Sequence, residues 1–174
     1  MSKIIIFLLG SLIISKISWA TLFNTRSHGF FRFFAFEFLL ILVLVNSNFW
    51  FYHPFSFFQI ISWLLLITAL ALAFSGFYSL YRYGKPTSSI EITTYLVTSG
   101  IYKYIRHPLY SSLIFLGTAC FFKNTSLLAT SLVFVATAFF YATARAEEME
   151  NLLKFGEDYA IYIKRTKMFV PFVF

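Results

Sequence analysis

Long apolar stretches separated by short polar turns dominate the hydrophobic pattern of this 174-residue chain. The stretches predicted to cross a membrane are residues 4–23, 30–51, 55–81, 108–122 and 125–143. A membrane-spanning helix needs about 20 apolar residues, so 108–122 is short for a full crossing whereas the first three stretches are long enough. Because only Lys123 and Asn124 separate the last two stretches, we expect them to form a helical hairpin. The pattern predicts an all-α, polytopic integral membrane protein with about five transmembrane helices.

The first apolar stretch allows two interpretations. Lys3, the apolar run that follows it and the small residues up to Ala20 are typical of a cleaved signal peptide. The same residues also form the first part of a span over 4–23, with Lys16 reaching the lipid head groups or facing other helices. We favour the retained span, because a polytopic protein usually keeps its first helix.

We expect one membrane domain made of two halves. Residues 1–83 carry the first three spans, and residues 84–174 carry a polar loop at 87–105, the hairpin and the C-terminal helices. Glu37 lies inside the second span, where an acidic side chain is either functional or paired with a polar group of a neighbouring helix. We favour the paired interpretation, because Glu37 is only about a turn and a half from Arg32.

The C-terminal end is predicted to leave the membrane as a helix. The last apolar stretch continues without a break signal to Phe155, and Gly156 is a typical helix terminator. Residues 157–167 then form a basic, amphipathic extension, in which Tyr159, Tyr162 and Ile163 are suited to the membrane interface.

Composition and charge add an orientation. Hydrophobic residues make up 59% of the chain and charged residues 12%, which is more apolar surface than a soluble protein of this size can bury. The Lys and Arg residues behind the formal charge of +7 lie between and after the apolar stretches. Membrane topology and anionic lipids explain their places, so no nucleic-acid partner is expected. By the positive-inside rule, the loops at Arg82 and Lys103 and the C-terminal end lie in the cytoplasm, opposite the loops at His53 and Lys123.

One polar, turn-rich stretch, LVTSGIYKYIRHPLY at 96–110, stands out from the apolar pattern. Proline suits the first turn of a helix because it has no N–H to leave unpaired, and it displaces the preceding residue from helical geometry. His107 is therefore expected just outside a helix N-terminus that begins at Pro108, where backbone N–H groups and the helix dipole favour an anion. The stretch indicates a site for a small, partly anionic ligand at the membrane edge.

A second polar stretch, EEMENLLKFGEDYAIYIKR at 147–165, holds most of the acidic residues. On a helix, Glu147, Glu150 and Lys154 share one face, and a solvated amphipathic extension is enough to explain this spacing. The alternative is that a carboxylate of this stretch faces the anion-receptive helix start near His107. Such an arrangement would suit a zwitterionic ligand.

Together these two stretches resemble the isoprenylcysteine carboxyl methyltransferase family and the related phospholipid N-methyltransferases. A Gly-x-Tyr, an Arg-His-Pro-x-Tyr, a helical hairpin, a Glu pair, a Phe-Gly and two spaced tyrosines follow in the family's order between Tyr95 and Arg165. The N-terminal spans resemble the family only as apolar membrane spans and carry none of these motifs. The resemblance implies S-adenosylmethionine as the cofactor, bound in a cytoplasm-facing pocket beside the membrane, and a lipidic substrate that enters from the bilayer.

Carried over by position, the resemblance implies a cofactor site, while no catalytic residue and no metal site can be assigned. The residues implied to hold the cofactor are Tyr95, Leu96, Val97, Tyr102, His107, Pro108, Leu109, Tyr110, Glu147 and Glu148. The family often has an arginine one helical turn before the first Glu, at a place linked to the substrate. Here that place is Thr143 and the nearest arginine is Arg145, so these two residues are the candidates for substrate contact.

The resulting expectation is an S-adenosylmethionine-dependent membrane methyltransferase with a lipidic or membrane-delivered acceptor. A carboxylate acceptor is favoured because it needs no general base, whereas an amine, phenol or thiol must first lose a proton. Two alternatives stay open. An NADPH-dependent membrane reductase of lipid or sterol-like substrates would bind NADPH instead, and a non-catalytic membrane protein on the same scaffold would bind the cofactor without transferring a methyl group.

Overall fold

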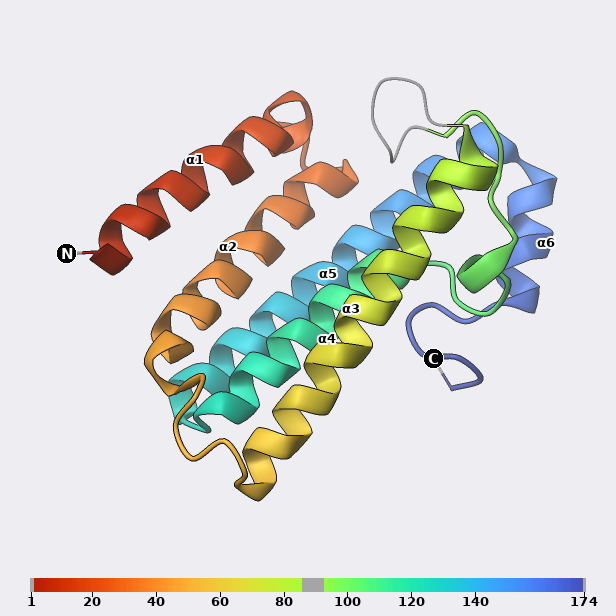
Figure 1. Ribbon diagram of the computed structural model, residues 1–174. Coiled ribbons are helices and arrows are strands. Elements are labelled where there is room, and N and C mark those ends of the chain that lie inside the picture. The colour runs from red at the N-terminus through yellow and green to blue at the C-terminus, as the bar shows by residue number, and fades with distance from the viewer. Residues whose placement is uncertain (1, 86–92, 174) are drawn as a thin grey trace. The chain divides into compact units, whose positions relative to one another are not determined.

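Helices make up most of the computed structural model, which describes residues 2–85 and 93–173 (Figure 1). The elements in chain order are α1 (Ser2–Leu22), α2 (His28–Asn46), η1 (Ser47–Phe49), α3 (Phe57–Gly84), η2 (Gly100–Lys103), α4 (Pro108–Lys123), α5 (Leu127–Phe155) and α6 (Glu157–Arg165). An isolated parallel bridge pairs Ile105 with Lys167, and the described ranges contain no longer strand. The predicted all-α class is confirmed for this part of the chain, and residues 87–92 of the predicted polar loop lie outside it.

Three helical segments are long and apolar enough to cross a membrane, namely His28–Phe49, Phe57–Gly84 and Leu127–Phe155. They fall on three of the five predicted stretches, as expected for a helical membrane protein. Crossings by α1 and by α4, which has 16 residues, stay predictions.

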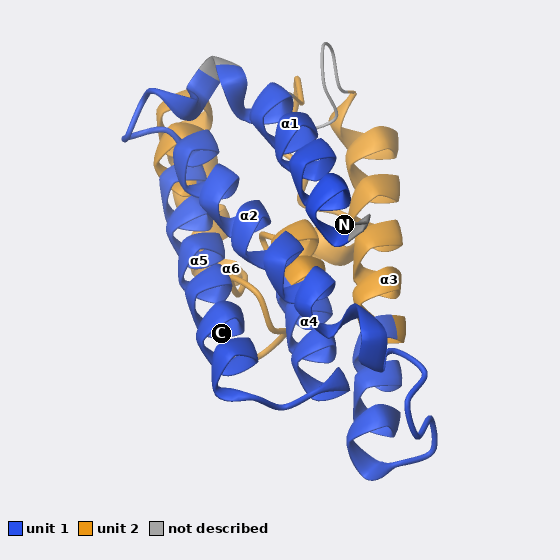
Figure 2. Ribbon diagram, turned by 90° about the vertical axis from the view of Figure 1, so that its left-hand side faces the viewer, with its two compact units in different colours: residues 1–66, 114–147 blue, residues 67–113, 148–174 orange. Residues whose placement is uncertain are grey.

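The chain divides into two compact units (Figure 2). Unit 1 comprises Met1–Leu66 and Ile114–Glu147, and unit 2 comprises Ile67–Leu113 and Glu148–Phe174. Helices α3, α4 and α5 each contribute residues to both units.

In unit 1, α1 and α2 lie side by side as an antiparallel pair (Figures 1 and 2). The Ser11 hydroxyl on α1 donates a hydrogen bond of 2.8 Å to Oε2 of Glu37 on α2. The acidic side chain inside the second predicted span therefore has a polar partner on a neighbouring helix, as favoured from the sequence. Such pairing lowers the cost of a carboxyl group within the membrane.

The predicted hairpin of α4 and α5 has a core in unit 1. Cys120 of α4 packs with Leu42 of α2 and with Ala129 and Leu132 of α5, and all four are buried. Phe139 of α5 adds a stacked ring contact with Phe38 of α2, with centroids 5.8 Å apart. These contacts join helices that are distant in the sequence by burying apolar side chains.

Polar side chains in unit 1 satisfy the carbonyl groups at the end of α4. The Asn46 amide nitrogen donates to the Cys120 carbonyl at 2.7 Å and to the Asn124 carbonyl at 3.4 Å. The Gln59 amide nitrogen donates to the Lys123 carbonyl at 3.3 Å. The last four carbonyls of a helix lack partners in the helix itself, so Asn46 and Gln59 act as caps supplied by other elements.

In unit 2, the end of α3 packs against the polar stretch that follows it. Leu80 of α3 forms a buried cluster with Val97 and Tyr102. A Cβ atom added to Gly76 of α3 would lie 2.8 Å from Cδ2 of Leu109, so glycine allows the first turn of α4 to approach α3 closely. The stretch before α4 is thereby fixed at the end of a helix that is long enough to span the membrane.

The joint between α5 and α6 is Gly156, as predicted. Its φ is +58° and its ψ is −128°, and its N–H donates to the Leu152 carbonyl at 2.9 Å. Tyr159 and Tyr162 have exposed fractions of only 3% and 6%, so their side chains do not face outward, while the place of α6 at the membrane interface stays a prediction. Both side chains pack inside unit 2, where the Tyr162 hydroxyl finds a backbone partner.

Candidate functional site

Backbone pairing brings the C-terminal segment alongside the residues that precede α4. The Arg106 N–H donates to the Lys167 carbonyl at 2.8 Å, the His107 N–H donates to the Met168 carbonyl at 3.1 Å, and the Lys167 N–H donates to the Tyr104 carbonyl at 3.1 Å. The Ser111 hydroxyl of α4 adds hydrogen bonds to the carbonyls of His107 and Phe169, at 2.9 and 2.8 Å. His107 is therefore held just outside the start of α4, as its position before Pro108 predicts.

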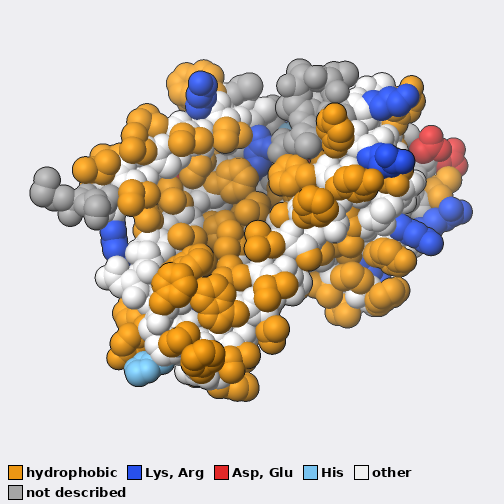
Figure 3. Space-filling model, viewed as in Figure 1, with side chains coloured by type: hydrophobic (Ala, Val, Ile, Leu, Met, Phe, Trp, Pro, Cys, Tyr) orange, Lys and Arg blue, Asp and Glu red, His pale blue; other side chains and the backbone are white. Residues whose placement is uncertain are grey.

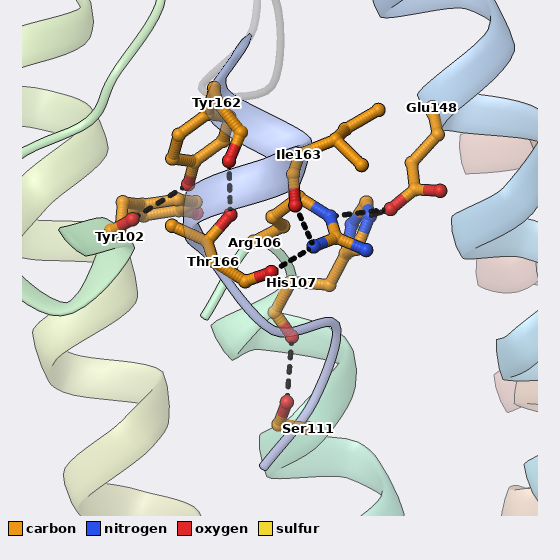
Figure 4. A network of polar contacts seen from close by, with 8 residues as sticks. All are labelled: Tyr102, Arg106, His107, Ser111, Glu148, Tyr162, Ile163 and Thr166. Carbon is orange, nitrogen blue, oxygen red and sulfur yellow. Dashed lines mark hydrogen bonds and ion pairs between the residues drawn. The ribbon is translucent and has the colours of Figure 1, made fainter. Parts of the chain in front are cut away.

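Three charged or ionisable side chains meet at this point, and we call Arg106, His107 and Glu148 the Arg106 cluster (Figure 4). Nε of Arg106 donates to Oε1 of Glu148 at 2.6 Å, and Nε2 of His107 lies 3.5 Å from the same oxygen. Glu148 is 2% exposed and His107 4%. A buried carboxylate needs such charge-assisted contacts, because burial without them would be very costly.

Arg106 also holds the end of α6. Its Nη1 donates to the carbonyl of Thr166 at 2.5 Å and to that of Ile163 at 3.3 Å (Figure 4). These carbonyls belong to the last turn and the C-cap of α6, where a positive charge is favourable. One guanidinium group thus joins the start of α4, the end of α5 and the end of α6 within unit 2.

Tyr162 provides a second link between α6 and the polar stretch. Its hydroxyl donates to the Tyr102 carbonyl at 2.7 Å (Figure 4). Burial is the main cause that raises the pKa of Tyr162 well above its ordinary value, and the neighbouring Tyr159 adds to it. The Tyr162 hydroxyl therefore stays protonated at neutral pH and remains a hydrogen-bond donor.

Aromatic rings surround His107. The Tyr110 ring stacks on it with centroids 5.6 Å apart, and the Phe169 ring lies at 6.2 Å and is tilted by 51°. These rings fix the imidazole plane and shield the contact with Glu148 from water. The arrangement offers a ligand a carboxylate and an imidazole whose positions are already set.

The predicted cofactor residues divide between the two units. Unit 2 holds the members Tyr95, Leu96, Val97, Tyr102, His107, Pro108, Leu109, Tyr110 and Glu148. Val97 and Tyr102 are buried in the cluster with Leu80, so their side chains serve packing. The Tyr95 ring is 55% exposed and has Lys85 Nζ at 5.4 Å from its centroid. The structure thus brings His107 and Glu148 together, and the role of the set as a cofactor site stays a prediction.

The other predicted residues belong to the part of α5 in unit 1. Thr143 is fully buried, and its hydroxyl donates to the Phe139 carbonyl one turn earlier at 2.7 Å. Arg145 is exposed and Glu147 is half-buried. Their assignment to the substrate or the cofactor stays a prediction.

Reasoning from the sequence missed that Arg106 lies at the centre of the network. Arg106 stands in the quoted RHP motif, but the sequence predicts no partner for its side chain. Two of its partners are backbone carbonyls in the last turn and at the C-cap of α6, which no pattern of side chains reveals. The available signal was an arginine directly before a predicted site histidine, together with an acidic pair elsewhere in the chain.

The donors of Arg106 leave capacity for a ligand. Nε and Nη1 are used by Glu148, Ile163 and Thr166, whereas Nη2 makes no hydrogen bond within residues 2–85 and 93–173. No group of three or more His, Cys, Asp or Glu side chains in these ranges could hold a metal ion.

In a comparison with known proteins, a family model matches the part of the chain that contains this cluster. The family model described as phospholipid methyltransferase matches residues 57–154, which include the Arg106 cluster. The human protein-S-isoprenylcysteine O-methyltransferase is 34% identical over 80 residues, which is 45% of this chain and 28% of the human protein. The match thus covers less than a third of the length of that curated relative.

Proposed function

Because the chain belongs to the phospholipid methyltransferase family, we propose that it is a membrane methyltransferase that uses S-adenosylmethionine and a lipidic acceptor. The observation that carries the proposal is the Arg106 cluster, which is buried, polar and inside the matched region. The apolar helices beside it support an acceptor delivered by the membrane. We propose that the site faces the cytoplasm, which the predicted orientation supports.

The side chains of the Arg106 cluster fit this cofactor. The methionine end of S-adenosylmethionine carries an ammonium group and a carboxylate, and the cluster combines a fixed carboxylate on Glu148 with the Nη2 donor of Arg106. When bound, S-adenosylmethionine supplies a methyl group that its sulfonium makes electrophilic. The protein then has to orient the acceptor and exclude water, for which buried, hydrogen-bonded side chains are suited.

An oxygen acceptor, such as a lipid-linked carboxylate, is the substrate class we propose. A carboxylate needs no general base, and His107 is already in contact with Glu148. The name of the human relative, an O-methyltransferase of S-isoprenylcysteine, supports an oxygen atom on a lipid-bearing group. We assign no catalytic residue.

Calorimetric titration of the detergent-purified protein tests the cofactor. We expect S-adenosylmethionine to bind and NADPH not to bind, and we expect Glu148→Gln, His107→Ala and Glu147→Ala each to weaken binding by roughly tenfold, about 1.4 kcal/mol. Lys16→Gln is the control, because Lys16 is exposed in unit 1 and outside the predicted site. Binding of NADPH alone, or S-adenosylmethionine binding that none of the three substitutions changes, would reject the proposed site.

Transfer of a radiolabelled methyl group to membrane lipid extracts tests the acceptor. A methyl ester on a carboxylate releases volatile methanol in mild base, whereas a methylated amine does not. We expect base-labile label that depends on the wild-type protein. Base-stable label would indicate that the acceptor is an amine and not a carboxylate. Cofactor binding without any methyl transfer would favour a non-catalytic binding protein.

A further inference from the structure

Four basic side chains are exposed near the C-terminal end of unit 2. We call Lys103, Lys164, Arg165 and Lys167 the C-terminal basic surface. None of the four forms an ion pair with an acidic side chain in the part of the chain that the structure describes. Lys and Arg side chains are visible over the region of α6 and the end of α3 in Figure 3. In the described part of the chain these four side chains thus carry positive charge without a direct ion-pair partner, while the acidic Glu157 and Asp158 occupy the first turn of α6.

Exposed apolar side chains accompany these charges. Tyr104 is 45% exposed and Phe172 83%, and their rings form a pair with centroids 6.1 Å apart. Lys103 Nζ lies 5.9 Å from the centroid of the Tyr104 ring, and Val173 beyond Phe172 is also exposed. Aromatic and basic side chains that share a surface are typical of the boundary between lipid tails and head groups.

Contacts within unit 2 place this surface at the end of a membrane-spanning helix. The Tyr162 hydroxyl ties α6 to the Tyr102 carbonyl, and the Tyr102 side chain packs on Leu80, one turn before the end of α3 at Gly84. Since α3 is long and apolar enough to cross the bilayer, α6 lies where the lipid head groups are.

The same segment is joined to the Arg106 cluster. Lys167 shares two backbone hydrogen bonds and a bridge with residues 104–106, and the carbonyls of Met168 and Phe169 accept from His107 and Ser111. Arg106 Nη1 donates to Thr166, which lies between the basic side chains of Arg165 and Lys167. Any ligand that fixes Lys164–Lys167 therefore also supports the position of Arg106 and His107.

We propose that the C-terminal basic surface binds the phosphate head groups of anionic phospholipids, and that this binding stabilises the pairing of residues 104–107 with 166–169. The charge of the surface selects anionic over zwitterionic lipid, and Tyr104 and Phe172 insert at the level of the acyl boundary. The anionic lipid is thereby an effector of the Arg106 cluster. The proposal does not depend on methyl transfer, because lipid binding occurs without cofactor or acceptor.

Titration of short-chain phosphatidylglycerol into the protein in neutral detergent tests the binding, with short-chain phosphatidylcholine and inorganic phosphate as the comparison probes. The test variant is Lys164→Gln/Arg165→Gln/Lys167→Gln, and all three side chains are exposed. The matched control is Lys3→Gln/Lys16→Gln/Arg26→Gln, which removes the same charge from unit 1. We expect the test variant to bind phosphatidylglycerol on the order of 100-fold more weakly, and the control to bind like the wild type.

Amide hydrogen exchange tests the coupling. In the wild type and the control, phosphatidylglycerol should slow exchange at the N–H groups of Arg106, His107 and Lys167, whereas in the test variant it should not. Equal binding of phosphatidylglycerol and phosphatidylcholine by the wild type, or unchanged binding by the test variant, would overturn the proposal. The same protection by inorganic phosphate alone would assign the surface to free phosphate. Should the triple variant not fold, Lys167→Gln must weaken binding and Lys164→Arg must retain it, and the opposite result also overturns the proposal.

Discussion

Arg106 is the side chain on which three parts of unit 2 depend. Replacing it by Gln leaves Glu148, which is 2% exposed, without its principal charged partner. Breaking a buried ion pair from one side costs about 3 to 5 kcal/mol. We expect Arg106→Gln to lower the free energy of unfolding by that amount, measured by denaturant titration in detergent.

The matched comparison is the double substitution Arg106→Gln/Glu148→Gln. Because it removes both charges, no uncompensated carboxylate is left, and we expect it to be more stable than Arg106→Gln alone. Arg106→Lys should stay destabilised, because one ammonium group cannot reproduce the planar arrangement that reaches Glu148, Ile163 and Thr166. If Arg106→Gln is as stable as the wild type, the cluster does not hold α6.

Tyr162 gives a prediction that depends on pH. Tyr162→Phe leaves the Tyr102 carbonyl without its partner and should cost about 1 to 3 kcal/mol. Because burial raises the pKa of Tyr162 in the folded state, its stabilising contribution is complete below the unfolded pKa of about 10 and is lost as pH rises further. The stability difference between wild type and variant should therefore be constant from about pH 6 to 9 and shrink above about pH 10.

At the site, the sequence was informative about side chains and uninformative about backbone partners. The place of His107 before Pro108 is predictable from proline geometry, and a carboxylate of the stretch 147–165 facing this helix start is an open alternative to a solvated extension. The contacts of Glu148 with His107 and Arg106 depend on the rotation of α5 about its axis. Hydrophobic periodicity does not determine this rotation, because the helix is apolar on most sides. The bonds from Arg106 to α6 carbonyls depend on the path of the chain after Gly156.

Among the elements, α4 depends on caps from α2 and α3. Asn46→Ala and Gln59→Ala each leave carbonyls at the end of α4 without a donor, and we expect each to cost about 1 to 3 kcal/mol. Ser62→Ala is the matched control. Its hydroxyl donates to the Ala119 carbonyl, which precedes the last four of α4 and keeps its helical partner, so the cost should stay below about 1 kcal/mol. Thermal unfolding followed by circular dichroism measures all three, and equal losses would mean that capping is not the cause.

Helix bounds were predictable where backbone chemistry marks them. Pro108 begins α4 because proline has no N–H to leave unpaired in the first turn. Gly156 follows the end of α5 because glycine, which has no Cβ, accepts the backbone conformation that ends a helix. The second span was predicted to reach residue 51, but α2 ends at Asn46 and η1 follows. The Asn46 side chain bonds to carbonyls of the α4 end, a tertiary contact that no local pattern contains.

For the whole molecule, orientation in the membrane is the property that the charge pattern predicts. In a Cys120→Ala background, we expect Ser56→Cys and Thr125→Cys to react with a membrane-impermeant maleimide on intact cells. Ser99→Cys and Lys164→Cys should react only after lysis, because the positive-inside rule places them in the cytoplasm. All four sites are exposed, so failure to react reports the side of the membrane and not burial. Labelling of Lys164→Cys on intact cells would reverse the orientation and move the Arg106 cluster to the other side.

The positive φ of Gly156 predicts that L-alanine and D-alanine at this position affect the joint between α5 and α6 differently. A Cβ atom built on it would meet nothing within 4 Å, so the glycine serves the backbone and not the packing. Its φ of +58° and ψ of −128° are unfavourable for an L residue, but their mirror image lies in a broadly allowed region. L-alanine at this position should destabilise the joint by about 1 to 2 kcal/mol. D-alanine, introduced by ligating a synthetic C-terminal peptide, should be accepted and should stiffen the unfolded chain. The direction in which α6 leaves α5 thus depends on a single achiral Cα, which accepts a positive φ because it carries no side chain.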